Sequence, residues 1–247
     1  MDKAEAERVV ESTLKELGLI DWVRVLLFTD TKEYIDAIEK AVGQSLDRTA
    51  RERLEGVQAA YLPVGQAICV VASQSRDEAT LHRCVKHEGL GHYGINTFRP
   101  DEKRLVLDTI MNSRDESSAV DTPFIDNVHT LKDLWRAVES TYPENSPQMN
   151  AEEVFAFVAE HASGDVSRIS HGADTLDELL AEQSRMTLSL AQLRDITENV
   201  AAGIKLGIRE PQTEPQQNDA QYRKDVCYWG QEDQALDQDE EYGPEMD

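Results

Sequence analysis

The stretch Lys86-His-Glu-Gly-Leu-Gly-His-Tyr-Gly94 decides how this chain of 247 residues is interpreted. It places Glu88 directly after His87, and a second histidine, His92, five residues after the first. In the common zinc-binding helix the two histidines are four residues apart, which separates them by about 40° around the helix axis. Five residues give about 140°, so a regular helix would turn the two imidazoles away from each other. The spacing therefore indicates either a chance pairing or a helix with one widened turn, which the two glycines of the motif would make possible.

A pair of acids, Glu152 and Glu153, lies further along the chain in the stretch Asn150-Ala-Glu-Glu-Val-Phe-Ala156. Two neutral imidazoles and one carboxylate, with a fourth position left to water, form the usual open site of a catalytic zinc ion. The same residues fit another pattern, because Asn150 followed three positions later by Glu153 is also typical of a helix capping box. One carboxylate cannot serve both purposes, and the upstream histidines favour the metal. Ala156 would leave room for a facing helix.

The hydrophobic pattern around these motifs predicts an α+β fold. Apolar residues at helical spacing mark helices, and short apolar runs rich in β-branched residues mark strands. Helices are expected at Lys3–Leu17, Thr31–Val42, Asp77–His87, Pro100–Met111, Leu131–Val138, Asn150–His161 and Thr175–Ile208, and strands at Trp22–Phe28, Val57–Leu62 and Gln66–Ala72. Pro63-Val-Gly65 is a turn that would join the last two strands into a hairpin.

The charge balance of the chain limits its partners. Acidic side chains outnumber basic ones 48 to 25, which leaves a formal net charge of −23 at pH 7. Such a balance repels a phosphate backbone, so we expect no nucleic-acid partner. No apolar run reaches the roughly 20 residues that a membrane span requires, so no membrane partner is expected either. The first residues are too charged for a secretory signal. These observations predict a cytoplasmic protein, one that could also be delivered into a host cell with mobile DNA.

The composition changes near residue 209. Glutamine, aspartate, glutamate and proline dominate after that point, so the segment can bury little apolar surface. We therefore expect a single domain over residues 1–208, with the metal motifs in a core of about 57–163, and an acidic, disordered tail over residues 209–247.

The order of the two motifs resembles that of the gluzincin metallopeptidases of the dipeptidyl peptidase III kind, in which a six-residue histidine motif precedes a paired glutamate. It is more similar still to the zincin-like metallopeptidase domain of phage and plasmid polyvalent proteins. There a strand such as Ala60–Cys69 precedes a His-Glu-x-x-Gly-His-x-Gly signature, as in His87–Gly94. The resemblance covers about residues 57–163, under half of the chain. It implies a zincin-like α+β domain with a small mixed sheet, an active-site helix and a mainly helical C-terminal part.

Carried over residue by residue, the resemblance implies that His87, His92 and Glu153 bind Zn2+ and that Glu88 is the catalytic general base. Glu152 would hydrogen bond to a ligand histidine and fix its tautomer. Four further residues are candidate donors to an oxyanion: Tyr93, His129, Tyr142 and His161.

These roles predict a zinc metallopeptidase, a hydrolase that cleaves a protein or peptide substrate and is encoded by a phage or plasmid. Zinc would lower the pKa of a bound water towards 7, and Glu88 would take its proton and pass it to the leaving amine. Two other classes remain open: a zinc-binding module without catalysis, and an acidic interaction protein such as a nucleic-acid mimic or an inhibitor of a host factor. Zinc binding without turnover would favour the first, and competition with DNA for a basic partner would favour the second.

Overall fold

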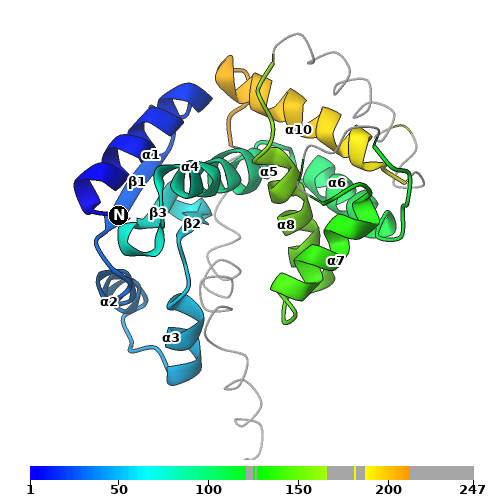
Figure 1. The fold of residues 1–247 in the computed structure, drawn as a ribbon. Helices are drawn as coiled ribbons and strands as arrows, with labels where there is room; N and C mark the ends of the chain where they lie inside the picture. Colours follow the sequence, from blue (N-terminus) through cyan, green and yellow to red (C-terminus); the bar gives the residue numbers. More distant parts are fainter. Residues whose placement is uncertain (121–124, 126, 166–180, 182–186, 212–247) are drawn as a thin grey trace, which may run out of the picture.

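The computed structural model describes residues 1–120, 125, 127–165, 181 and 187–211 of the chain. In this part an N-terminal half, which holds the sheet, is joined to a C-terminal helical half by the helix that carries the histidine motif (Figure 1). The α+β class and the small mixed sheet that the sequence predicts are confirmed. None of the helices in the described ranges is long and apolar enough to cross a membrane.

The sheet has three strands in the order β1-β3-β2. Their bounds are β1 (Arg24–Phe28), β2 (Ala59–Leu62) and β3 (Ala67–Val71). All five residues of β3 are buried, as expected of a central strand whose sequence is a continuous apolar run. β3 pairs in parallel with β1 and antiparallel with β2. The predicted hairpin between β2 and β3 is therefore confirmed, and its turn is a short 3₁₀ helix at Pro63–Gly65.

Helices α1 (Lys3–Leu17) and α2 (Thr31–Val42) occupy the ranges that the sequence predicts. Each follows an aspartate, Asp2 or Asp30, whose side chain accepts a hydrogen bond from a backbone N–H of the first turn. Each is followed by a glycine with a φ of 75°, which ends the helix in the left-handed conformation. These two signals, a cap and a stop, make the bounds readable from the sequence.

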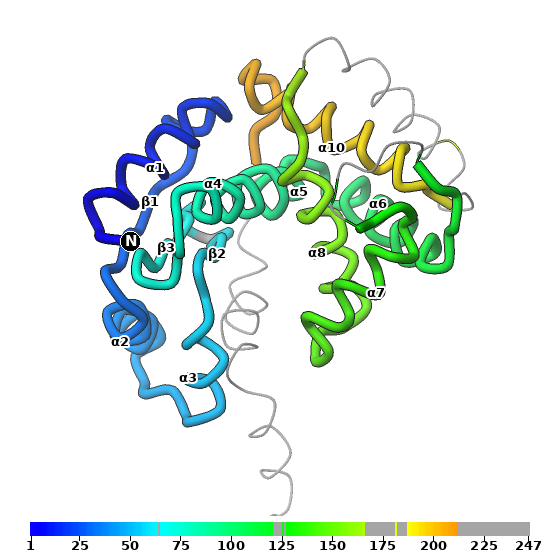
Figure 2. The backbone as a smooth tube through the Cα atoms, in the orientation of Figure 1, coloured from blue at the N-terminus to red at the C-terminus, as the bar shows by residue number. Residues whose placement is uncertain are grey.

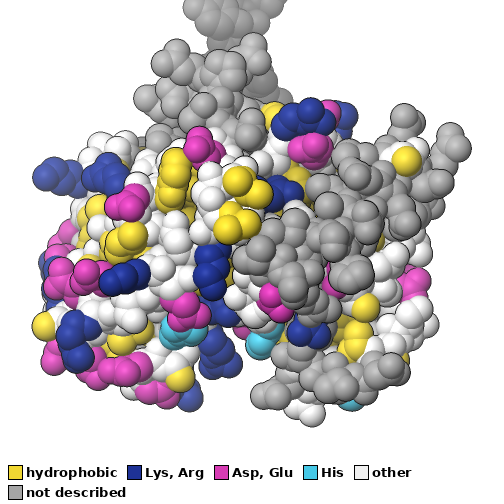
Figure 3. All heavy atoms as spheres, turned by 90° about the horizontal axis from the view of Figure 1, so that it is seen from above, with side chains coloured by type: hydrophobic (Ala, Val, Ile, Leu, Met, Phe, Trp, Pro, Cys, Tyr) yellow, Lys and Arg dark blue, Asp and Glu magenta, His cyan; other side chains and the backbone are white. Residues whose placement is uncertain are grey.

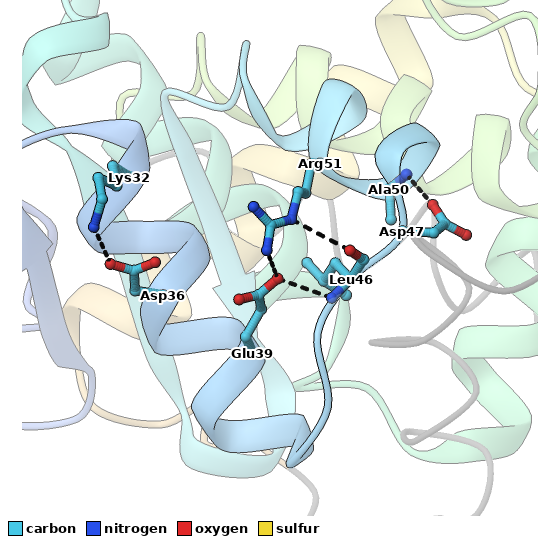
Figure 4. A network of polar contacts seen from close by, with 7 residues as sticks. All are labelled: Lys32, Asp36, Glu39, Leu46, Asp47, Ala50 and Arg51. Carbon is cyan, nitrogen blue, oxygen red and sulfur yellow. Dashed lines mark hydrogen bonds and ion pairs between the residues drawn. The ribbon is translucent and has the colours of Figure 1, made fainter.

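Helix α3 (Arg48–Leu54) was not anticipated. Its seven residues bury only two side chains, which is too few for a clear periodic pattern. Figure 4 shows what holds it: Asp47 accepts a hydrogen bond from a backbone N–H of its first turn, and Arg51 pairs with Glu39 of α2. Glu39 also accepts a hydrogen bond from the backbone N–H of Leu46, at 2.8 Å. α3 therefore depends on contacts with α2 that the sequence pattern does not show.

The motif helix begins as α4 (Glu78–Lys86) and ends as α5 (Tyr93–Ile95). The other described helices are α6 (Pro100–Asn112), α7 (Leu131–Thr141), α8 (Pro147–Ala159) and α10 (Leu190–Lys205). Figure 2 shows α4 and its continuation running across the upper part of the molecule, from the sheet towards α8. The fold thus brings the motif helix against α8, in which Glu153 lies.

Two predictions about the C-terminal part need comment. The long helix expected from Thr175 is wrong in its described part, because residues 187–189 are not helical and α10 begins after the N-cap Ser189. The residue at which that helix was expected to begin, Thr175, lies outside the described residues, as do residues 212–247 of the predicted tail. At the start of that tail, the guanidinium of Arg209 packs over the ring of Phe98, 4.7 Å from its centroid.

Candidate metal centre

The histidine motif lies in a π-helix, His87–His92, that continues α4 and runs on into α5. The i→i+5 pattern is visible where the backbone N–H of Tyr93 donates to the carbonyl of Glu88. Five residues of a π-helix make a little more than one turn, so residues five apart share a face. The two imidazoles accordingly lie together, with ring centroids 5.1 Å apart. Of the two possibilities that the spacing left open, the widened turn is therefore the one that the structure shows.

The glycines of the motif supply space rather than backbone freedom. Neither Gly89 nor Gly91 has a positive φ. A Cβ on Gly91 would lie 2.4 Å from the Cβ of Ala156 and 2.6 Å from its Cα, so the π-helix and α8 are in backbone contact there. A Cβ on Gly89 would lie 2.9 Å from a methyl group of Leu19. The expected role of the glycines is therefore corrected, whereas the prediction that Ala156 leaves room for a facing helix is confirmed.

Helix α8 brings Glu153 to both histidines. Its Oε2 lies 3.3 Å from Nε2 of His87, and its Oε1 lies 3.6 Å from Nε2 of His92. Ligand atoms about 2.0–2.1 Å from a tetrahedral zinc ion are separated from one another by about 3.3 Å. Glu153 Oε2 is also buried and makes no hydrogen bond within the described part of the chain. These residues therefore fit a divalent metal ion.

The alternative interpretation of the acidic pair does not hold. The N-cap of α8 is Ser146, whose hydroxyl accepts a hydrogen bond from the backbone N–H of Met149 at 3.3 Å. Asn150 lies inside the helix and is buried. The capping box that Asn150 and Glu153 could have formed is thus excluded, and the carboxylate is free for the site.

Glu88 approaches the histidines from the same helix. Its Oε2 accepts a hydrogen bond from the backbone N–H of Tyr61 in β2, at 2.7 Å. One ligand atom from each of His87, Glu88 and His92 can be chosen within 4.8 Å of one another, so Glu88 could enter the coordination sphere. However, one of its oxygens is committed to Tyr61, whereas both oxygens of Glu153 face an imidazole. Glu153 and Glu88 are therefore both candidates for a third ligand, and Glu153 is the one with each oxygen beside an imidazole nitrogen.

The carboxylate on the far side of the His87 ring is Glu160. Its Oε2 lies 3.1 Å from Nδ1 of His87, and its Oε1 lies 3.2 Å from Nε2 of His161. A carboxylate in this position keeps the proton on Nδ1 and leaves Nε2 for a metal ion. Glu152, for which this contact was expected, instead pairs with Nζ of Lys103 at 3.1 Å.

Glu160 could have been found from its spacing, because it follows Glu153 by seven residues and so lies on the same face, two helical turns on. Phe157, between them, also belongs to this face. Its ring packs edge-on against the imidazole of His87, with centroids 5.1 Å apart. One face of α8 and its C-terminal end thus supplies a ligand, a packing contact and a hydrogen-bond acceptor to a single histidine.

The charges of the site shift the pKa values of its members. Burial alone would lower the pKa of His87, but its close contact with Glu153, its hydrogen bond to Glu160 and the charge of Glu88 raise it to about 10. The pKa of Glu153 is lowered because His87 and His92 outweigh the effect of burial. The pKa of Glu160 falls to about 2 because its two histidine partners likewise outweigh burial. Without a metal ion His87 therefore carries a proton, which metal binding must displace.

Of the four candidate oxyanion donors, Tyr142 is the one whose pKa responds to the charges of Glu153 and Glu88. It directly follows α7, and burial, together with the negative charges of Glu153 and Glu88, raises its pKa above the ordinary value of 10. Its phenol therefore senses the carboxylates of the site and stays protonated at neutral pH. A protonated phenol can donate a hydrogen bond to a ligand in the centre.

The other three candidates have different surroundings. His161 is engaged with Glu160, at 3.2 Å. Tyr93 is completely buried, and its ring packs edge-on against that of Tyr61, with centroids 5.9 Å apart. His129 is exposed on the segment before α7. Nothing in their described contacts brings these side chains to the metal-binding atoms.

Among known proteins, the chain is similar to DNA primase TraC of Escherichia coli. The two sequences are 33% identical over 144 residues, which is 57% of this chain and 9% of the relative. The chain thus spans less than a tenth of the length of this relative. No family model and no solved structure matches the chain.

This similarity overturns the predicted activity. A relative that is named as a DNA primase points to DNA rather than to peptide hydrolysis. The predictions of a metallopeptidase, of a protein or peptide substrate and of no nucleic-acid partner are therefore wrong. The histidine motif and Glu153 can specify an ion, but not the bond on which that ion acts.

The prediction that excluded a nucleic-acid partner was wrong because it relied on the net charge of the whole chain. A net charge is a sum over the whole chain and does not describe the field at any one surface. Residues 212–247 contain 11 acidic and 2 basic side chains, so this segment alone contributes −9 of the total of −23.

Proposed function

We propose that this chain is a zinc-binding domain that acts in DNA replication, as the counterpart of one segment of a DNA primase. The similarity to DNA primase TraC supports the link with DNA. Because the chain corresponds to so small a share of that relative, we propose a role for the shared segment and not primer synthesis as a whole. The zincin-like resemblance of residues 57–163 supports an origin in a mobile element. Such a domain would act in the cytoplasm, with the DNA.

The observation that carries the metal centre is the convergence of His87, His92 and Glu153 from two separate helices, with separations of 3.3 and 3.6 Å between carboxylate oxygens and imidazole nitrogens. Three protein ligands leave one position open, which is typical of catalytic rather than structural zinc sites. When bound there, zinc would lower the pKa of a coordinated water to about 7. The arrangement thus favours an enzyme, and nucleic acid is the substrate that we propose for it.

The side chains around the ion would accept or donate protons and would orient the imidazole of His87. The backbone N–H of Tyr61 holds one oxygen of Glu88, which leaves the other to accept a proton in the site. Tyr142 would donate a hydrogen bond to an oxygen of the ligand, since its raised pKa keeps the phenol protonated. Glu160 would keep Nε2 of His87 directed to the ion.

The metal centre can be tested by elemental analysis of the purified protein after dialysis. We expect about one zinc ion per chain in the parent, and loss of zinc in the variants His87→Ala and Glu153→Ala. Glu88→Gln is the matched control, because it changes a carboxylate of the same site that is not proposed as a ligand. If Glu153→Ala retains zinc and Glu88→Gln loses it, then Glu88 is the third ligand and Glu153 is not. A parent that binds no zinc would refute the centre.

The link with DNA can be tested separately, by the fluorescence anisotropy of a labelled single-stranded oligonucleotide. Lysine and arginine side chains lie among the acidic ones on the described part of the face in Figure 3, so this face is not uniformly acidic. We expect the zinc-loaded protein to bind with a dissociation constant of about 1–100 μM, and more weakly as the salt concentration rises. An unchanged anisotropy at about 100 μM protein would refute the nucleic-acid role and leave the metal centre standing.

A further inference from the structure

Three side chains tie the C-terminal end of the π-helix to α8. Asn96 donates a hydrogen bond from Nδ2 to the backbone carbonyl of His92, at 2.7 Å. Nζ of Lys103 donates to Oδ1 of the same asparagine, at 3.1 Å. Nζ of Lys103 also lies 3.1 Å from Oε1 of Glu152. A continuous path of polar contacts therefore leads from the backbone of one candidate ligand to the residue that precedes another, Glu153.

The first contact satisfies a carbonyl that the helix itself leaves open. α5 ends at Ile95, and the backbone N–H groups of Asn96 and Thr97 donate to Tyr93 and Gly94 rather than to His92, as is common for the last carbonyls of a helix. The side chain of Asn96 supplies the donor to His92. Because a buried or half-buried carbonyl is costly to leave without a partner, the backbone at His92 is coupled to the position of Asn96.

The second and third contacts fix Asn96 against two other helices. Lys103 belongs to α6 and Glu152 to α8, and their side chains are 26% and 27% exposed. Salt screens a partly buried pair less than a fully exposed one. The ammonium of Lys103 therefore joins α6, α8 and the end of the π-helix at one point.

We propose that Asn96, Lys103 and Glu152 are positioning residues, which set the place of His92 relative to Glu153. This proposal rests on the proposed metal centre. None of the three residues is among the ligand atoms of the site; they act through the backbone of His92 and through α8. Glu152 was expected to contact a ligand imidazole directly, whereas it reaches the backbone of His92 through Lys103 and Asn96.

The test uses Co2+ as a spectroscopic replacement for zinc in the full chain. We expect Lys103→Met to weaken Co2+ binding about tenfold, as for other residues that support metal ligands. The visible absorption of the bound Co2+ should also change, because His92 is displaced. Lys103→Arg should restore most of the affinity. Lys132→Met is the matched control, since Lys132 pairs with the exposed Asp115, at 3.4 Å, and makes no described contact with the π-helix.

A second pair of variants guards against a general loss of structure. Asn96→Ala should give the same spectral change as Lys103→Met, and Glu152→Gln combined with Lys103→Met should lower the affinity no further than Lys103→Met alone. A spectrum and an affinity in Lys103→Met equal to those in Lys132→Met would overturn the positioning role while the parent still binds the ion. A parent that binds neither Co2+ nor Zn2+ would instead refute the metal centre, and this proposal with it.

Discussion

His87 and His92 face the same carboxylate, yet the protein holds them in different ways. His87 is fixed at its ring, by the hydrogen bond between Nδ1 and Glu160 and by the edge of Phe157. His92 has no such ring contact within the described ranges except His87 and Glu153, and it is fixed at its backbone by Asn96. Its side chain is also more exposed, 20% against 12%. One ligand is therefore oriented by its imidazole, and the other by the helix that carries it.

The largest effect is expected where both histidines lose their common support. In Gly91→Ala the new methyl group would meet the backbone of Ala156 at 2.6 Å, so the π-helix and α8 must separate. Overpacking of a core costs about 1–3 kcal/mol, and a clash with backbone belongs at the upper end. We expect a lower urea midpoint and no bound zinc, measured by denaturation and elemental analysis.

Gly56→Ala is the control for this change. Gly56 has no positive φ, and no heavy atom lies within 4 Å of the position that its new methyl group would take. Its stability should change by less than about 0.5 kcal/mol, and zinc should stay bound. If Gly91→Ala behaves like Gly56→Ala, the close approach of the two helices is not what holds the histidines together.

The next effect distinguishes the two histidines. Glu160→Gln keeps the shape of the side chain but removes its charge, so Nδ1 of His87 loses a charge-assisted partner. We expect zinc affinity to fall about 10–100-fold, measured by competition with a chelator. The hydrogen bond from Asn96 to the backbone carbonyl of His92 does not involve Glu160 and should be untouched. An unchanged affinity would show that the ring of His87 does not need this carboxylate.

Local signals predicted much of the fold, and long-range contacts accounted for the errors. Aspartate caps and glycine stops bound α1 and α2, and an apolar run gave the central strand. The five-residue spacing of the histidines left two possibilities, a chance pairing or a widened turn, and the π-helix shows that the second is correct. α3 was missed because the contact of Arg51 with Glu39 is invisible in the sequence.

In the candidate site, too, some features could be predicted from local sequence and others depend on long-range contacts. The candidate ligands were named from two short motifs and the resemblance that these carry, whereas the partners of those side chains depend on which helices meet. The sequence predicted Glu152 as the support for a histidine and did not single out Glu160, whereas the packing of α6 and α8 pairs Glu152 with Lys103 and places Glu160 beside His87. The substrate is set by neither kind of signal, which is why the peptidase prediction failed.

The pH dependence of the free energy of unfolding of the metal-free protein tests how strongly His87 holds its proton. Its folded pKa is raised from 6.5 to about 10, so the stabilisation is complete below about pH 6.5 and is lost as the pH rises towards 10. We expect the free energy of unfolding in the presence of EDTA to fall between pH 6 and pH 9. The decrease should be at least about 1.4 kcal/mol, the equivalent of one pKa unit.

His87→Gln is the control for the pH experiment, because glutamine does not titrate. In that variant the decrease between pH 6 and pH 9 should be smaller by the amount that His87 contributes. Equal decreases in the parent and the variant would mean that the proton on His87 is no more strongly held than in the unfolded chain.

The smallest effect concerns the ring contact of His87. Phe157→Leu removes the edge-on packing, which is worth about 0.5–1.5 kcal/mol for a pair of rings, but keeps the hydrogen bond to Glu160. Zinc affinity should therefore fall by only a few-fold, and Phe157→Tyr, which keeps a ring, should retain it. A loss as large as that of Glu160→Gln would mean that packing, and not the carboxylate, orients this histidine. His87 and His92 would then differ in how much of each ring is packed against an aromatic neighbour. In the described structure the ring of His92 has no such neighbour other than His87 itself.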